Sequence, residues 1–478
     1  MGRRSRLGIY SGLYAIFYSF CLYKNLGGAT FPFFVIGTLC YISLCTKEFG
    51  YTWKKDTALL AVLTVLIGLS HPLTDKSFIH AFNIIFSFIL LFYIAMHQFS
   101  YDKDWSFSKT LYNLLCMGIG AFSKFFTPFT DLSEYLKSKK QADPEKESGP
   151  NRFLAVTLTV IIMIPVLIIV TAILASADYV FARMMGDISN ALFKEATWLK
   201  VSLLSIFVFF FVYGLFVFLS KLPFTPGNSE RKTFDPTVAV TAGALLDIVY
   251  LVFSVIQIVY LFIGKMQLPL GMTYAKYARE GFYQLLAICF FNLILVLIGK
   301  SLFSDNIILK IILTVMCACT YIMTASSVLR LILYIRYYYI TFVRVLALWA
   351  LFVICVLLTG LLIHIWTDKI NLFKFSFVFV ISAYVVLAFS HTDYWIARFN
   401  VSQMGVSSGF FLDSDGYDDM RYFERHCCLD AADVILSLDD RETTEKFLDN
   451  NKADKPLNFR NFNVSRYLAV KKAGIKTH

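Results

Sequence analysis

The sequence predicts an all-α, polytopic transmembrane bundle of about eleven spans (ten to twelve), with interfacial amphipathic helices and a small helical soluble tail. Hydrophobic residues make up 58% of the 478 residues and charged residues only 16%, which is too little polar surface for a water-soluble particle of this size. The apolar residues also form bilayer-length runs between charged breaks. A cytosolic enzyme and a disulfide-framework protein are therefore excluded, the latter because most of the ten cysteines lie within apolar runs.

The expected spans follow from helix geometry, because a helix rising about 1.5 Å per residue crosses a hydrocarbon layer of about 30 Å in about 20 residues. The first three expected spans are short, which suits little tilt, local thinning of the bilayer or a partly re-entrant path. In chain order the spans are residues 8–23, 29–45, 56–70, 78–97, 152–173, 200–220, 237–263, 282–299, 307–328, 342–365 and 371–390.

Basic residues favour the cytoplasmic face, and Arg3, Arg4 and Arg6 therefore predict a cytoplasmic N-terminus. No cleavage site follows the first apolar run, so we expect that run to remain as an anchor. Eleven crossings from the cytoplasm would leave the tail on the opposite face. The basic loops near residues 276–279 and 330–344 favour the cytoplasm instead, which requires one crossing more or fewer between residues 152 and 236. We therefore expect a cytoplasmic tail.

The chain divides by composition into four parts. Residues 1–97 form a four-span region, residues 98–151 a polar linker with an amphipathic helix, residues 152–399 the main bundle and residues 400–478 the soluble tail. The segment 176–197 has apolar residues at helical spacing but also carries charges that each cost about 2.5–3.5 kcal/mol at the centre of a bilayer. We expect an interfacial helix there, acting as a strut or lid or, alternatively, as a moving gate.

The tail is the one part with a composition suited to folding in water. It holds 13 acidic and 11 basic residues, a net charge of −2, so the membrane-embedded part carries +13 and all of the positive excess of the +11 chain. That excess predicts attraction to anionic lipid headgroups rather than to nucleic acid. We expect two short helices near residues 431–438 and 440–448, and a docking surface for a protein partner in the tail.

No catalytic, nucleotide-binding or metal-binding motif is present in the sequence, and neither a cofactor nor a metal is expected. Cysteines within apolar helices usually act as small apolar side chains. The adjacent Cys427 and Cys428 in the tail fit a reducing compartment.

Ionisable residues inside spans are the main functional lead, because a charge in hydrocarbon needs a partner or water. Asp247 lies near the middle of its span, and Arg279 and Glu280 precede the span that contains Asn292. These four residues are candidates for an ion or ligand path. Asp247 is alternatively a carboxyl group hydrogen-bonded to a neighbouring helix, and Arg279 and Glu280 are alternatively anchors in an aromatic interface belt.

Three arginines, Arg330, Arg336 and Arg344, lie around a Tyr-rich turn. As the default interpretation they are cytoplasmic topology anchors. Alternatively they bind phosphate or lipid headgroups, for which the guanidinium group is well suited.

Three stretches carry a family resemblance. The first is Tyr-Ala-Lys-Tyr-Ala-Arg-Glu-Gly-Phe-Tyr-Gln-Leu at 274–285, followed by Asn292. The second is Arg-Leu-Ile-Leu-Tyr at 330–334, followed by Thr341 and Arg344, and the third is the exit from the last span. The exit motif comprises His391, Asp393, Arg398 and Asn400. Together they resemble a bacterial membrane-protein family catalogued as domain of unknown function 4173, a relative of 4153. That family's pattern has Asn where this chain has His391, and a glycine turn near Tyr338. The resemblance implies a bacterial plasma-membrane protein and supplies no activity.

Two classes of function therefore compete. In the first, the bundle transports a solute or handles lipid along a polar path marked by Asp247. In the second, the bundle senses the membrane or scaffolds a partner and signals through the tail. An intramembrane enzyme ranks third, because no nucleophile and base pair can be identified from the sequence.

Overall fold

The computed structural model describes residues 3–25, 28–100, 105, 107–142, parts of 163–193, 197–221, 234–259, 281–367, 371–404, 419–438, 440–453 and 457–474. Every named element in these residues is helical, which confirms the predicted all-α class. Eight of the described helices are long and apolar enough to cross a bilayer. They are α2 (Thr30–Glu48), α4 (Ser77–Phe99), α9 (Thr197–Lys221), α10 (Pro236–Gln257), α12 (Phe282–Leu302), α13 (Ile307–Tyr338), α14 (Phe342–Trp366) and α15 (Leu372–Phe389).

The expected spans nearest the N-terminus also form helices, although two of them are not among these eight. Helix α1 (Arg3–Leu22) begins with three arginines, and α3 (Thr57–Ser70) has only 14 residues before the short 3₁₀ helix η1 (His71–Leu73). The expected span 152–173 lies mostly outside the described residues. Ten of the eleven predicted spans therefore have a matching helix in the described part of the chain.

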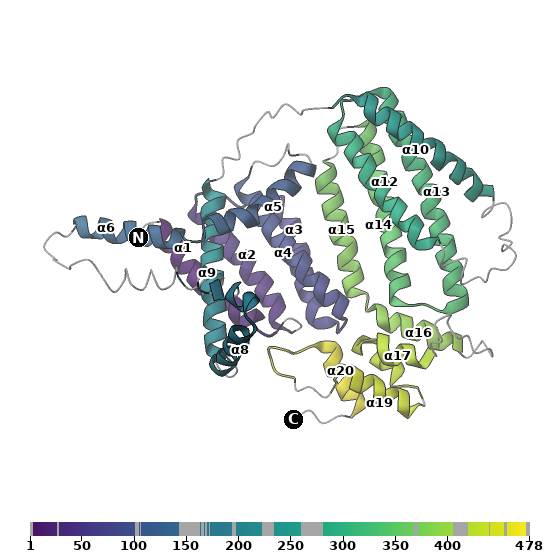
Figure 1. Cartoon of the computed structure of the whole chain (residues 1–478). Coiled ribbons are helices and arrows are strands. Elements are labelled where there is room, and N and C mark those ends of the chain that lie inside the picture. The colour runs from purple at the N-terminus through teal and green to yellow at the C-terminus, as the bar shows by residue number, and fades with distance from the viewer. Residues whose placement is uncertain are drawn as a thin grey trace.

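The N-terminal helices pack around an aromatic core. Helices α1 to α4 and α9 meet at side chains such as Phe34, Tyr41 and Phe216, all of which are buried. The amphipathic helix α5 (Phe107–Ser123) lies against α9, where Gly214 approaches the backbone of Ala121 so closely that a Cβ atom would clash with it. Helices α6 (Thr127–Ala142) and α8 (Tyr179–Phe193) complete this half of the molecule (Figure 1).

A second bundle contains α10, α12, α13 and α14 and has its own apolar core. Helix α15 lies between this bundle and the N-terminal helices (Figure 1). It contacts both α14 and α3, and its buried Tyr384 hydroxyl donates to Asn83 Oδ1 on α4 at 2.7 Å. Helix α15 therefore joins the two halves.

Contacts at the helix ends define two faces of the bundle. On one face, Arg6 pairs with Glu48 at 2.7 Å and Lys374 with Asp56 at 3.3 Å. On the other face, the turn after η1 contacts the tail (Figure 1). The N-terminus and the tail thus lie at opposite ends of the helices.

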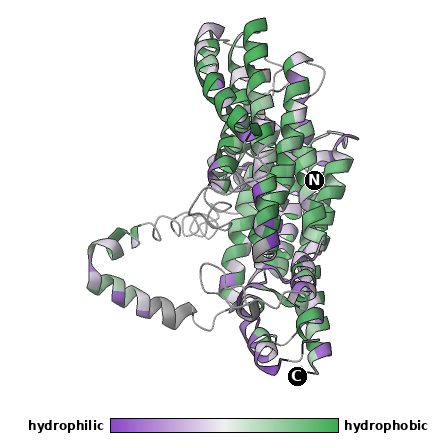
Figure 2. Cartoon of the chain, turned by 90° about the vertical axis from the view of Figure 1, so that its right-hand side faces the viewer, coloured by the Kyte–Doolittle hydropathy of each residue, from purple (hydrophilic) through white to green (hydrophobic). Residues whose placement is uncertain are grey.

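The tail is a small helical unit that shares its core with the end of the membrane part. Phe423, Ile435 and Phe447 are fully buried together with Ala397 of α16 (Thr392–Met404). The boundary predicted at residue 400 therefore falls inside α16. Hydrophilic residues concentrate in this unit near the C-terminus (Figure 2). Its other elements are α17 (Asp419–His426), η3 (Leu429–Ala431), α18 (Ala432–Ile435), α19 (Arg441–Asn450) and α20 (Val464–Ala473).

Candidate functional site

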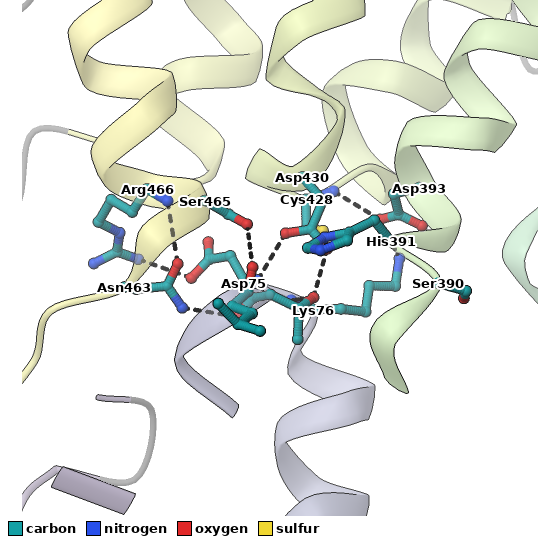
Figure 3. Close-up of polar contacts among 12 residues, drawn as sticks. Asp75, Lys76, Ser390, His391, Asp393, Cys428, Asp430, Asn463, Ser465 and Arg466 are labelled. Atoms are coloured by element: carbon teal, nitrogen blue, oxygen red, sulfur yellow. Dashed lines mark hydrogen bonds and ion pairs between the residues drawn. The ribbon is translucent and has the colours of Figure 1, made fainter. Parts of the chain in front are cut away.

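The tail is attached to the membrane helices by a polar network that we call the tail clasp (Figure 3). The clasp joins three parts of the chain that are far apart in sequence. They are the turn Thr74, Asp75 and Lys76 between α3 and α4, the exit residues His391 and Asp393, and the tail residues Cys428, Asp430, Asn463, Ser465 and Arg466.

Asp430 is the first centre of the clasp. Its carboxylate accepts hydrogen bonds from the Thr74 hydroxyl and from the backbone N–H of Asp75, the latter at 2.9 Å, and it lies 3.5 Å from Nδ1 of His391. Burial alone would raise the pKa of Asp430, but the hydrogen bonds from His391, Thr74 and Asp75 outweigh burial and hold its pKa below the usual range. Asp430 is therefore ionised when the tail is docked.

Asp393 is the second centre, and its side chain is completely buried. It accepts from Lys76 Nζ at 2.7 Å and from the backbone N–H of Cys428 at 2.9 Å. Lys76 also donates to the backbone carbonyl of His426 at 2.9 Å. Both hydrogen bonds reach Oδ2 and pair the buried charge, whereas Oδ1 is buried without a hydrogen-bond partner among the described residues.

Helix α20 supplies the third part of the clasp through its N-terminal turn. Asn463 caps this helix by accepting from the backbone N–H of Arg466, and its side-chain amide donates to the Thr74 carbonyl at 2.7 Å. Ser465 donates to the Leu73 carbonyl at 2.7 Å, and Arg466 pairs with Asp75 at 3.5 Å. The capping residue of the tail helix thus also binds the membrane-side turn.

His391 has a backbone φ of 44°, in the left-handed region that most side chains avoid. Asn and His are among the non-glycine residues that tolerate this conformation best, which explains why His can stand where the resembled pattern has Asn. The pKa of His391 is raised, chiefly by its hydrogen bond to Asp430. The turn that ends α15 therefore aims His391 at the tail.

The structure brings only part of the predicted exit motif into the clasp. His391 and Asp393 belong to it. Asn400 instead pairs with both backbone groups of Ile340, at 3.0 and 2.9 Å, and so fixes the turn between α13 and α14. Arg398 is exposed, and its side chain bonds the Tyr394 hydroxyl.

A second polar site lies inside the second bundle. Asn292 is fully buried, its Oδ1 accepts from the Tyr250 hydroxyl at 2.8 Å, and its amide donates to Thr320 Oγ1 at 3.0 Å. We call these three residues, from α10, α12 and α13, the intramembrane amide cluster. Neutral groups that bond one another across helices are the usual way to hold a polar side chain in lipid.

Near the clasp-side end of the same bundle, Gln257 accepts from Ser326 at 2.6 Å and from Arg330 at 3.3 Å. The guanidinium group of Arg330 also lies beside Gly281, whose φ of 99° starts α12. Arg330 is therefore a buried residue that bonds a neighbouring helix.

The other predicted site residues have different surroundings. Arg344 is buried, donates to the Tyr339 carbonyl and stacks 3.9 Å from the Tyr334 ring centroid. Arg336 is exposed. Arg279 and Glu280 lie outside the described residues.

Asp247 is buried within α10, facing α13. Its Oδ1 atom has no hydrogen-bond partner among the described residues. The thiols of Cys317 and Cys319 lie within electrostatic range of it. Asp247 and Asn292 both face the interior of one bundle, as the path hypothesis requires.

Sequence reasoning missed the turn residues of the clasp, Thr74, Asp75 and Lys76. Their signal was a short polar break between two apolar runs, which is typical of any loop between spans. Asp430 and the segment 463–466 were missed as well, because nothing in the sequence paired them with a turn more than 300 residues away. Among the described residues, no group of three or more His, Cys, Asp or Glu side chains is arranged to hold a metal ion.

A family model described as domain of unknown function (DUF4153) matches residues 61–425 of the chain. The matched region contains the intramembrane amide cluster and, of the clasp, the turn and the exit residues. No curated protein and no solved structure matches. Since the match covers well over half of the sequence, the chain belongs to the family described as domain of unknown function (DUF4153).

Proposed function

We propose that this membrane protein has a sensory or scaffolding role, in which the tail clasp couples the arrangement of the membrane helices to the soluble tail. The observation that carries the proposal is the clasp itself. It ties the tail to the α3–α4 turn and to the end of α15, the helix that joins the two halves of the bundle. A shift of either half would change the distances from the buried carboxylates of Asp393 and Asp430 to their hydrogen-bond donors on the α3–α4 turn.

We further propose an orientation, with the N-terminus in the cytoplasm of a bacterium and the tail on the opposite side of the plasma membrane. The supporting observation is that more basic residues lie at the helix ends of the N-terminal face than at the opposite ends. On the N-terminal face these residues include Arg3, Arg4, Arg6, Lys47, Lys54, Lys55, Lys221, Lys300, Lys310 and Lys374. At the opposite ends of the described spans they are Lys24, Lys76, Lys200, Arg330, Arg336 and Arg344, of which Arg330 and Arg344 are buried. Labelling cysteines introduced at the two ends of the helices from each side of intact cells would test this orientation.

Other sequence-based expectations join the proposal. We retain the division of the chain at residues 97, 151 and 399 and the binding of a protein partner by residues 400–478. We also retain the attraction of the basic membrane part to anionic headgroups and the closer kinship to the related family 4173. All four fit a membrane scaffold. Arg336, which is exposed beside the turn at residue 340, is the best placed of the three arginines to meet a headgroup.

The role of the clasp can be tested in a bacterium that carries the gene. One strain lacks the gene, a second carries the double substitution Asp393→Ala and Asp430→Ala, and a third carries Asp449→Ala on the exposed face of α19 as a matched control. We expect the double variant to reproduce the transcriptional response to gene loss while the control matches the wild type. A double variant that accumulates in the membrane and matches the wild type would refute the proposal.

A transport function is the second candidate, and the buried Asp247 is the observation that favours it. A carboxyl oxygen without a partner among the described residues is what a proton or cation carrier in a bundle would present. Purified protein in liposomes with an internal pH-sensitive dye would show proton flux that Asp247→Asn abolishes. If flux is absent, or is equal in the two proteins, proton transport through Asp247 is excluded.

A further inference from the structure

Two cavities meet where α15 leaves the membrane on the clasp side. The first, of about 870 Å³, lies between α16 and α20, and the second, of about 600 Å³, lies along α14 and α15. Ser390 and Trp395 line both of them. The two cavities therefore adjoin at these residues.

The chemistry of the lining changes from one cavity to the other. The cavity beside α20 contains His391, Lys471 and Lys472 together with the aromatic ring of Tyr394. The cavity between α14 and α15 is lined almost entirely by apolar side chains, including Phe352 and Val386. Polar and cationic groups thus lie at the bilayer surface and apolar groups lie at membrane depth.

The acidic residues of the polar cavity already have partners. Asp430 is held by the clasp, and Asp433 pairs with Lys472. Lys471 is exposed and makes no ion pair with any described residue. A positive charge is therefore left to face an incoming anion.

We propose that these two cavities form one binding site for a phospholipid with an anionic headgroup, with the phosphate beside Lys471 and an acyl chain between α14 and α15. Trp395, which is 59% exposed, lies at the boundary, where amphipathic aromatic rings are usual at a membrane surface. The adjoining apolar cavity favours a lipid over a free phosphate, because a soluble anion would leave that cavity unused. The site does not depend on the proposed sensory role.

Binding can be measured by native mass spectrometry of the full chain in detergent, with phosphatidylglycerol and phosphatidylcholine of identical acyl chains. We expect preferential binding of phosphatidylglycerol. Because one lysine near an anionic surface contributes about 1 kcal/mol, Lys471→Gln should reduce that preference about five-fold. Lys452→Gln, a tail lysine outside both cavities, should leave it unchanged. Equal binding of the two lipids, or equal behaviour of the two variants, would overturn the proposal.

A separate experiment tests whether an acyl chain occupies the apolar cavity. Val386→Trp fills the apolar cavity and should weaken both lipids equally, whereas Val249→Trp on the exposed face of α10 should not. In a second measurement, phosphatidylglycerol with brominated chains should quench a fluorescence component that Trp395→Phe removes. Glycerol 3-phosphate should not compete at equal concentration. Competition by glycerol 3-phosphate, with no quenching of Trp395, would identify a free-phosphate site and refute the lipid assignment.

Discussion

The tail clasp and the intramembrane amide cluster are both buried polar networks, yet they are built from different chemistry. The clasp uses carboxylates, a lysine and a histidine, and it connects segments separated by more than 300 residues. The amide cluster uses only an amide and two hydroxyls, from helices that are close in sequence.

The difference follows from the solvent around each network. At the membrane surface, ionised groups can be paired while water and backbone groups remain near. The free-energy cost of burying a charged network there is therefore small. Within hydrocarbon a charge costs several kcal/mol, and neutral groups must provide the contacts. The clasp therefore attaches one domain to another, whereas the amide cluster orients neighbouring helices.

The largest effect should come from removing a centre of the clasp. Asp393→Ala leaves Lys76 buried without its ion partner, and breaking such a pair costs about 3–5 kcal/mol. We expect the tail to become sensitive to protease and to unfold at lower temperature in the purified full chain. Asp433→Ala removes only an exposed ion pair and should cost less than about 1 kcal/mol. Equal protease resistance of the two variants would show that the clasp does not hold the tail.

A smaller effect should follow in the amide cluster. Asn292→Leu removes two interhelical hydrogen bonds, and such bonds average about 0.6 kcal/mol each in membrane proteins. Thermal denaturation in detergent should show a loss of about 1 kcal/mol, with the tail still resistant to protease. Thr241→Ala, whose hydroxyl bonds only its own helix, is the control. A loss as large as that of Asp393→Ala would remove the distinction between the two networks.

The pH dependence of the clasp gives the third test. The pKa of His391 is raised above its ordinary value of 6.5, so its contribution to stability is complete below pH 6.5 and disappears as the pH rises through the raised pKa. The pKa of Asp430 is lowered from 3.8, so the contribution of Asp430 is present above that value. Wild type and His391→Asn, which keeps a residue that tolerates the left-handed backbone, should therefore differ at pH about 5.5 and converge at pH about 8.5.

The expected difference at the lower pH is about 0.5 kcal/mol, since the His391 side chain is partly exposed to water. Denaturant titration of both proteins at the two pH values would measure it. The lowered pKa of His426, caused first by burial and then by Lys76, affects both proteins alike and cancels in the comparison. A difference that grows with increasing pH would contradict the assigned ion pair.

The smallest effect should come from the exit-motif residue outside the clasp. Arg398 is exposed, and its side chain interacts, within the described part of the chain, with the rings of Tyr394 and Trp395 and with the Tyr394 hydroxyl. Arg398→Gln should change stability by less than about 0.5 kcal/mol, as is usual for surface positions. Thermal denaturation would check this, and a loss comparable to that of Asp393→Ala would extend the clasp to the whole motif.

The spans were predictable because hydrocarbon imposes a length and a polarity on every crossing, and α4, α9, α12, α14 and α15 lie close to their predicted positions. Helix α13 begins where predicted but runs ten residues beyond its predicted end at residue 328. The burial of Asp247 and Asn292 followed from the same rule. The clasp was not predictable, because Asp75 and Lys76 resemble any loop and their partners depend on tertiary packing. The surroundings of Arg330 and Arg344 were not predictable for a related reason, since both side chains are buried instead of marking a face of the membrane.

The most direct test of the account is a crosslink between the α3–α4 turn and the tail in native membranes. A photoreactive benzoylphenylalanine at Leu73, whose side chain makes none of the hydrogen bonds of the clasp, would identify the neighbours of the turn in the full chain after mass spectrometry of the crosslinked peptides. We predict crosslinks to the peptides that contain Asp430 and Asn463, and their loss in the Asp393→Ala and Asp430→Ala double variant. Crosslinks confined to lipid or to other membrane helices would contradict the clasp.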